Sequence, residues 1–356
     1  MPISAVDTIA LAFQHTKRQL FQPFRFGQWT RLAIVGLLAG ELGSGGSFHL
    51  PSNFSSAQHG SQGPLRLPHI DPALLAGLIA TIVAAALIFM VVLTYISSVM
   101  RFVLFDGVLR KECHIREGWT SRQGPGLNYF FWSLALGFGT VGAILLLLGI
   151  PLALAYSAGW VTYPRDHLIP LILGGIVVFG LLLILVVAVA IVHVLTKDFV
   201  VPQMALDGIG PIEGWKRLWP MLQAEKGEYG VYILMKIVLA MGAAIAVGIA
   251  SVIVGVLFAV PVIGIAIGAV IAGKTAGLTW NALTITAAVV AGCILLAIFL
   301  CLIAMVSVPV VVFFPAYSIY FFAARYRPLS LALYPSSASA ATNPLPPDIP
   351  PAPAPA

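Results

Sequence analysis

Few ionisable residues lie inside the apolar parts of this sequence, and their chemistry is the first thing to consider. Three stand within or at the ends of long hydrophobic runs, namely Glu41, His193 and Lys236. A charged side chain in hydrocarbon costs roughly 3 kcal/mol or more, so such residues are candidates for a transport path or a proton relay. His193 and Lys236 stand near run ends, from which their polar tips can reach the interface. Glu41 precedes a polar stretch, so the alternative to a functional role is an ordinary residue at the outer interface.

The sequence contains no motif typical of an enzyme or of a metal centre. HExxH, Walker A and GxSxG motifs are absent, and no two carboxylates share a hydrophobic run. Histidines recur every ten residues from His49 to His69, close to Asp71, but this spacing matches no zinc signature. Cys293 and Cys301 would lie roughly 12 Å apart on a helix, beyond disulfide reach. We therefore expect a protein that is not an enzyme and that binds no metal or other cofactor.

The composition is typical of an integral membrane protein. Hydrophobic residues make up 60% of the 356 residues and charged residues only 9%, with a mean hydropathy of +0.99. A soluble domain has about 25% charged residues, so a soluble fold would lack polar surface. The net charge of +6 does not indicate nucleic-acid binding, because Lys and Arg flank the apolar runs instead of forming one patch. No secretory signal is expected, since the first apolar run begins only at Leu32.

Six hydrophobic segments are candidates for transmembrane helices. A helix needs about 20 apolar residues to cross a core of roughly 30 Å, so the first segment must be extended by its flanking residues. Fifteen Lys and Arg residues lie on one side of this arrangement and three on the other. The positive-inside rule then places both termini in the cytoplasm, and we expect the inner membrane of a prokaryote. The six segments are residues 29–42, 72–100, 128–150, 168–195, 229–260 and 282–322.

A pair of short motifs occurs twice in the chain. Phe-Val followed by Glu-Gly-Trp is found within residues 102–119 and again within residues 199–215, with spacings that differ by one residue. Residues 312–315 resemble the first part of the pattern. We expect three parallel repeats, each a cytoplasmic interfacial helix followed by a membrane hairpin. The alternative is three hairpins with a chance match. The repeats would cover about residues 1–112, 113–208 and 209–327.

The expected interfacial helices are amphipathic and carry aromatic residues. Residues 4–24 and 209–224 place apolar side chains at helical spacing on one face, and residues 114–124 form a shorter relative. Tryptophan favours the membrane interface because its ring is apolar and its N–H needs a partner. For residues 4–24 the alternative is a solvated helix packed on its own protein. The aromatic residues expected at the membrane surface are Phe13, Trp29, Trp119, Trp215 and Trp219.

Two prolines are expected to break long helices near the outer side of the membrane. A helix over residues 229–272 would be about 66 Å long, roughly twice the bilayer core, so we predict a break at Pro261. A similar sequence surrounds Pro151. The short segments after these prolines would re-enter the bilayer or lie on its surface. Gly264 and Gly268, four residues apart, would allow close helix packing or would line a path.

The chain resembles one known group of membrane proteins. The order of span, Phe-Val-aliphatic-Pro, charged loop with Glu-Gly-Trp, amphipathic helix and span is similar to the membrane domain attached to some glycerophosphodiester phosphodiesterases, and to its uncharacterised stand-alone prokaryotic relatives. The resemblance covers about residues 1–327. Residues 328–356 are rich in Pro and Ala, and we expect a disordered cytoplasmic tail. No phosphodiesterase domain is present, so the resemblance implies no catalytic residue.

These observations favour a multi-pass membrane protein that acts as a scaffold or that organises or senses the bilayer. Its expected partners are the lipid bilayer and a protein at the cytoplasmic face. The alternative is a transporter or channel for a small solute, with a path near Pro151 and Pro261, and a membrane-embedded lipid enzyme is a third reading. A polar cavity that reaches the middle of the membrane would favour transport.

Overall fold

The computed structural model describes residues 4–41, 72–163, 165–275, 277 and 282–334, and all regular structure in these residues is helical. The expected all-α membrane class is confirmed at this level. Two helices, at residues 7–21 and 211–224, lie within the segments 4–24 and 209–224 for which an amphipathic helix was expected. In chain order the elements are α1 (Asp7–Phe21), α2 (Phe26–Leu38), α3 (Pro72–Leu109), α4 (Ile115–Ser157), α5 (Leu168–Leu195), a π-helical turn η2 (Thr196–Val200), α6 (Val201–Asp207), α7 (Pro211–Ala224), α8 (Lys226–Thr275), α9 (Ala282–Ala323) and α10 (Arg327–Leu333).

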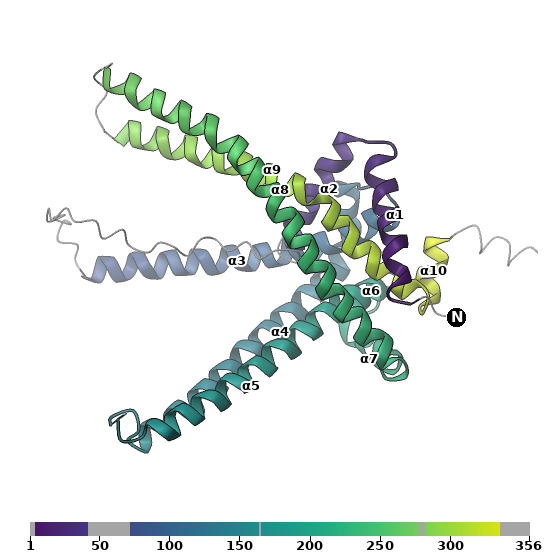
Figure 1. Cartoon of the computed structure of the whole chain (residues 1–356), viewed down its shortest axis with the longest axis horizontal. Helices are drawn as coiled ribbons and strands as arrows, with labels where there is room; N and C mark the ends of the chain where they lie inside the picture. The colour runs from purple at the N-terminus through teal and green to yellow at the C-terminus, as the bar shows by residue number, and fades with distance from the viewer. Residues whose placement is uncertain (1–3, 42–71, 164, 276, 278–281, 335–356) are drawn as a thin grey trace, which may run out of the picture.

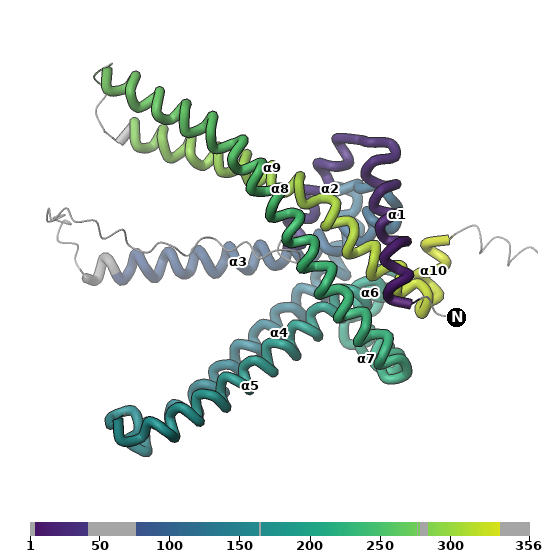
Figure 2. The backbone as a smooth tube through the Cα atoms, viewed as in Figure 1, coloured from purple at the N-terminus to yellow at the C-terminus, as the bar shows by residue number. Residues whose placement is uncertain are grey.

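Three arms of helix diverge from a common hub (Figures 1 and 2). One arm is α3, the second is the α4–α5 hairpin and the third is the α8–α9 hairpin. We use "hub" for α1, α2, η2, α6, α7 and α10 together with the parts of the long helices that pack against them. The buried hydrophobic core lies in the hub.

Five described helices are long and apolar enough to cross a membrane. In the most hydrophobic part of each, at most 11% of the residues are buried within the protein. Apolar side chains that cover a helix on all sides need an apolar surrounding, which lipid provides. The arms are therefore the membrane-spanning parts of a membrane protein.

The sixth expected span is not established by the described residues. Residues 29–42 correspond largely to α2, whose 13 residues measure about 20 Å. In addition, α2 packs against other helices through Leu32, Ala33 and Val35, which are buried in the hub. A sixth crossing would need the chain after Glu41, and residues 42–71, with the three histidines noted above, lie outside the described residues. Six spans therefore stay a prediction.

The predicted helix breaks at Pro151 and Pro261 were wrong. Helix α4 continues through Pro151 to Ser157, and α8 continues through Pro261 for a total of 50 residues, about 75 Å. Proline removes one backbone N–H and disturbs one earlier carbonyl, but the neighbouring turns keep their hydrogen bonds. In an apolar surrounding, ending the helix would expose several more backbone groups, so continuing it costs less. Consequently no separate short segment follows either proline.

Aromatic rings join the hub-side ends of the arms. Phe199 contacts Tyr229, Tyr232 and Phe321 with ring centroids 5.1–5.8 Å apart, and Tyr232 stacks on Tyr317 at 5.0 Å. These contacts connect η2 with α8 and α9. Aromatic pairs contribute about 0.5–1.5 kcal/mol beyond the burial of their area, so this group fixes the two hairpins relative to each other.

The first helix is held in the hub by a buried histidine. His15 of α1 is 3% exposed, and its Nε2 lies 3.0 Å from the carbonyl oxygen of Val108 in α3. Because that oxygen only accepts, Nε2 carries the proton, and Nδ1 accepts from the hydroxyl of Tyr320 in α9 at 3.1 Å. Burial lowers the pKa of His15 below its ordinary value of 6.5, with a further contribution from Lys111. The neutral imidazole thus joins three helices.

Two glycines, one in each copy of the repeated motif, allow helices to pack closely. A Cβ atom on Gly118 would lie 3.1 Å from Cγ1 of Val103, and one on Gly214 would lie 2.6 Å from Cγ1 of Val200. Both glycines belong to Glu-Gly-Trp motifs, and both valines follow the Phe of the Phe-Val motifs. At 2.6 Å no side chain fits without movement of its neighbour.

The substitution Gly214→Ala should destabilise the protein by about 1–3 kcal/mol, because the added methyl group overpacks the contact with Val200. Gly227→Ala is the matched control, since nothing lies within 4 Å of the position of its Cβ. Thermal unfolding of the full chain in detergent measures both. Equal melting temperatures for the two variants would contradict the close contact.

Candidate functional site

Five charged residues from distant parts of the chain meet inside the hub, at the bases of the arms. We call them the ionic cluster. They are contributed by the residues after α2, by α3, by η2 and by α8, and each interacts with at least one other member. The members of the cluster are Glu41, Arg101, Lys197, Asp198 and Lys236.

The first part of the cluster holds the end of α2. The carboxylate of Glu41, only 2% exposed, accepts a hydrogen bond from the ammonium group of Lys197. Arg101 attracts the same carboxylate, and its Nη2 donates to the carbonyl of Ala39 at 3.4 Å. Another guanidinium nitrogen of Arg101 donates to the hydroxyl of Tyr129. These contacts connect α2, α3, α4 and η2.

The second part connects η2 with α8. Lys236 donates to the Asp198 carboxylate, which is 3% exposed, and Tyr232 donates to the same oxygen at 2.9 Å. The side chain of Lys236 is 12% exposed, so the pair is shielded from solvent. A buried ion pair is tolerated where further hydrogen bonds satisfy its polar atoms, and Tyr232 supplies one here.

A π-helical turn explains how two consecutive residues serve both ion pairs. Residues Thr196–Val200 form η2. π-Helical turns are rare in proteins as a whole, and those that occur are frequently found at functional sites. Lys197 and Asp198 follow one another in this turn, yet one meets the end of α2 and the other meets α8. The turn is fixed by Trp215 of α7, whose indole N–H donates to the Thr196 hydroxyl at 3.0 Å.

The cluster encloses little space. A cavity of about 30 Å³ touches Glu41, Arg101, Lys197 and Asp198. This is enough for about one or two water molecules and too small for a solute. Three of the five charges are positive and two are negative, so the group as a whole is cationic. The arrangement is suited to holding helices together, and it offers no pair of nucleophile and base.

The residues predicted for a path are only partly brought together. Glu41 and Lys236 belong to the ionic cluster, although each pairs with a different partner. His193 is exposed on α5 and forms none of the ion pairs of the cluster, but it lies close enough to interact electrostatically with Arg101, Lys197, Glu41 and Asp198. Gly264 and Gly268, like Pro151 and Pro261, lie on the arms, and a Cβ on either glycine would meet nothing within 4 Å. Within the described part of the chain, no three His, Cys, Asp or Glu residues could hold a metal ion.

The aromatic residues predicted for the membrane surface fall into two groups. Phe13 and Trp219 are 64% and 53% exposed. Trp29 donates its N–H to the carbonyl of Met305 at 3.0 Å, Trp215 donates to Thr196, and Trp119 packs against the ring of Tyr95. The indole N–H groups of Trp29 and Trp215 thus find acceptors within the hub, and Trp119 contributes a ring contact there.

Sequence reasoning missed Arg101, Lys197 and Asp198 as site residues. A signal was present, because Arg101 directly precedes Phe102-Val103 and Asp198 directly precedes Phe199-Val200. A charge before each copy of a repeated apolar motif marks the same place in the hub. Arg101 and Lys197 were counted only among the Lys and Arg residues that indicate the topology, a count that describes flanking charges and not buried ones, and Asp198 was not part of it.

Removal of one partner of a buried pair should destabilise the fold strongly. Glu41→Gln leaves Lys197 and Arg101 without their counter-charge, and we expect a loss of about 3–5 kcal/mol. Arg217→Gln is the matched control, because its ion pairs with Asp207 and Glu213 are surface pairs worth about 0–1 kcal/mol. Unfolding in mixed micelles measures both free energies. Similar losses for the two variants would refute the role assigned to the cluster.

Comparison with known proteins places the chain in a family. No curated protein and no solved structure matches it. The resemblance to the membrane domain of glycerophosphodiester phosphodiesterases therefore stays a prediction. One family model, described as a family of unknown function, DUF7544, matches residues 3–332, which include all five members of the ionic cluster. The chain belongs to this family of unknown function, DUF7544.

Proposed function

We propose that the protein is a non-enzymatic membrane scaffold, in which a packed hub fixes the directions of three apolar arms. The observation that carries this proposal is the exposure of the arms. Leu87 in α3, Leu183 in α5 and Leu257 in α8 are 59%, 56% and 71% exposed, as are most of their apolar neighbours. Such surfaces are available to lipid and to the helices of other membrane proteins. In this proposal the arms position the lipids and the helices of other membrane proteins that contact them in the bilayer.

The same exposure argues against the alternative of a transporter or channel. A transport path needs helices that enclose it, with polar groups that face the inside. The cavity at Glu41 has room only for water, and Gly264 and Gly268 face open surroundings on their arm. The charges of the cluster are paired with each other and lie among the bases of the arms.

The topology we propose puts the hub and both ends of the chain in the cytoplasm of a prokaryote. Tyr317 in α9 donates to the carbonyl of Ala5 at 3.1 Å, and α10 follows α9 directly, so the start and the end of the described chain are neighbours (Figure 1). Most Lys and Arg residues belong to the hub side, which the positive-inside rule assigns to the cytoplasm.

Reporter fusions test the proposed sides. A reporter in the connection between α4 and α5, at residues 158–163, should lie outside the cytoplasm, whereas one after Tyr334 should lie inside it. A reporter at Gly208, between α6 and α7, is the control that should match the one after Tyr334. If the reporters at residues 158–163 and after Tyr334 occupied one compartment, the topology would be wrong.

The glycine contacts support the proposal of repeated units. Val103 with Gly118 and Val200 with Gly214 are equivalent residues of the two motif copies, and each pair brings an arm end against the following helix. A third contact has the same character, since a Cβ on Gly36 of α2 would lie 2.5 Å from Cγ1 of Val311 in α9. In this interpretation α1 and α2 pack against α9, the last helix of the α8–α9 arm, as the start of α4 packs against α3.

Cross-linking in native membranes distinguishes a scaffold from a transporter. Cysteine pairs at Leu87, Leu183 and Leu257, in a variant without native cysteines, should not be joined by a short bismaleimide if the arms stay apart. The control pair Gly255 with Phe299 should be joined, because a Cβ on Gly255 would lie 3.7 Å from the Phe299 ring within one arm. A photoreactive residue at Leu257 should capture lipid or another membrane protein. Efficient links between arms would instead favour a closed bundle and transport.

A further inference from the structure

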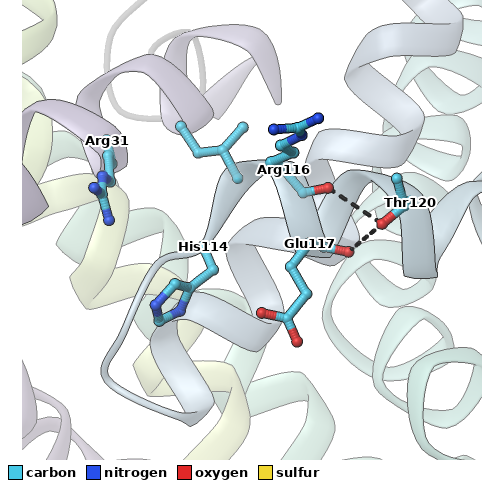
Figure 3. A pocket seen from close by; sticks show the side chains of 6 residues that line it. Arg31, His114, Arg116, Glu117 and Thr120 are labelled. Carbon is cyan, nitrogen blue, oxygen red and sulfur yellow. Dashed lines mark hydrogen bonds between the residues drawn. The ribbon is translucent and has the colours of Figure 1, made fainter.

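A second pocket lies on the hub surface, separate from the ionic cluster. It has a volume of about 530 Å³ and opens between α2 and the beginning of α4. Arg31 reaches it from α2, and the other lining residues come from the turn before α4 and its first turns (Figure 3). Its walls consist of Arg31, His114, Ile115, Arg116, Glu117 and Thr120.

The two arginines of this pocket differ from three others in the hub that are paired with carboxylates. Arg122, Arg217 and Arg325 each form an ion pair with a carboxylate. Neither Arg31 nor Arg116 forms an ion pair with any carboxylate of the described residues, although Glu117 lines the same pocket. Their positive charges are therefore available to a bound anion.

The wall of the pocket is arranged before any ligand binds. Nη1 of Arg31 donates to the carbonyl of Cys113 at 3.4 Å, which ties α2 to the turn before α4. In the same region Gln28 donates to the carbonyl of Lys111. A preformed site loses less conformational entropy on binding than a flexible one.

The backbone adds to the positive potential. Helix α4 begins here and runs for 43 residues, and its N-cap residue His114 makes no capping hydrogen bond with its side chain. The hydroxyl of Thr120 is turned back toward the carbonyls of Arg116 and Glu117, at 3.3 and 3.0 Å (Figure 3). The first N–H groups of a helix have no partner within the helix and attract anions.

We propose that this pocket binds a phosphate group carried by a small polar molecule or by a phospholipid headgroup. The guanidinium fork matches the oxygens of phosphate, and helix N-termini bind the same group. The volume is in the range of small-molecule sites, so it holds a phosphate with its attached polar group. In the sequence, Trp29 lies two residues before Arg31, and Trp119 directly precedes Thr120. This proposal does not depend on the scaffold function.

Binding to the full chain in neutral nanodiscs tests the site with three probes: inorganic phosphate, glycerol phosphate and a short-chain phosphatidate. Arg31→Gln with Arg116→Gln should weaken the binding of the phosphorylated probes by about tenfold or more, since each arginine provides a charge-assisted hydrogen bond. Lys226→Gln with Arg327→Gln, at two exposed positions elsewhere in the hub, removes the same charge and should leave binding within about twofold.

A second variant tests the pocket without removing the contact between Arg31 and Cys113. Glu117→Gln takes away the one carboxylate of the pocket, at an exposed position, and should tighten the binding of phosphate probes several-fold.

Equal affinity for glycerol phosphate and the phosphatidate would identify a soluble phosphate ester as the ligand, and preference for the phosphatidate would identify a lipid. Failure of all three probes to bind, or equal weakening by both double variants, would overturn the proposal.

Discussion

The architecture depends on two ion pairs made by neighbouring residues. Lys197 holds Glu41 at the end of α2, and Asp198 holds Lys236 in α8, so the π-helical turn that follows α5 is connected both to α2 in the hub and to the arm of α8 and α9. Because desolvation offsets much of the attraction in a buried pair, the pairs contribute more to the choice of geometry than to net stability. An aliphatic core could hold the same helices together but would allow them to slide or rotate.

Around these pairs, side chains with both apolar and polar parts complete the hub. The hydroxyl of Tyr232 reaches Asp198 while its ring lies in the aromatic core, and the indole of Trp215 packs in the hub while its N–H meets Thr196. Such side chains contribute buried area and also satisfy the polar atoms that charged residues bring inside. This explains why tryptophans whose sequence pattern suggested a membrane surface are in part hub residues.

The apolar arms could be predicted from hydropathy, because a long run of apolar residues determines a spanning helix locally. The continuation of α4 through Pro151 and of α8 through Pro261 could not be predicted, since local propensity overestimates the effect of proline where backbone hydrogen bonds have no alternative partner. The ionic cluster was also out of reach of local patterns. Glu41 and Lys236 were noted as unusual, but their partners Lys197 and Asp198 lie 156 and 38 residues away, and a single sequence does not reveal such pairs.

The position of α1 has a consequence for the synthesis of the chain. The carbonyl of Ala5 is bonded to a residue 312 positions later, and His15 is bonded to one 305 positions later. At roughly 5–20 residues per second, the ribosome reaches these partners about 15–60 s after it has made α1. During that interval the buried face of α1, with Leu20 and Ala12, lacks its final neighbours. Helix α1 thus gains its contacts with α9 only long after it has itself been made.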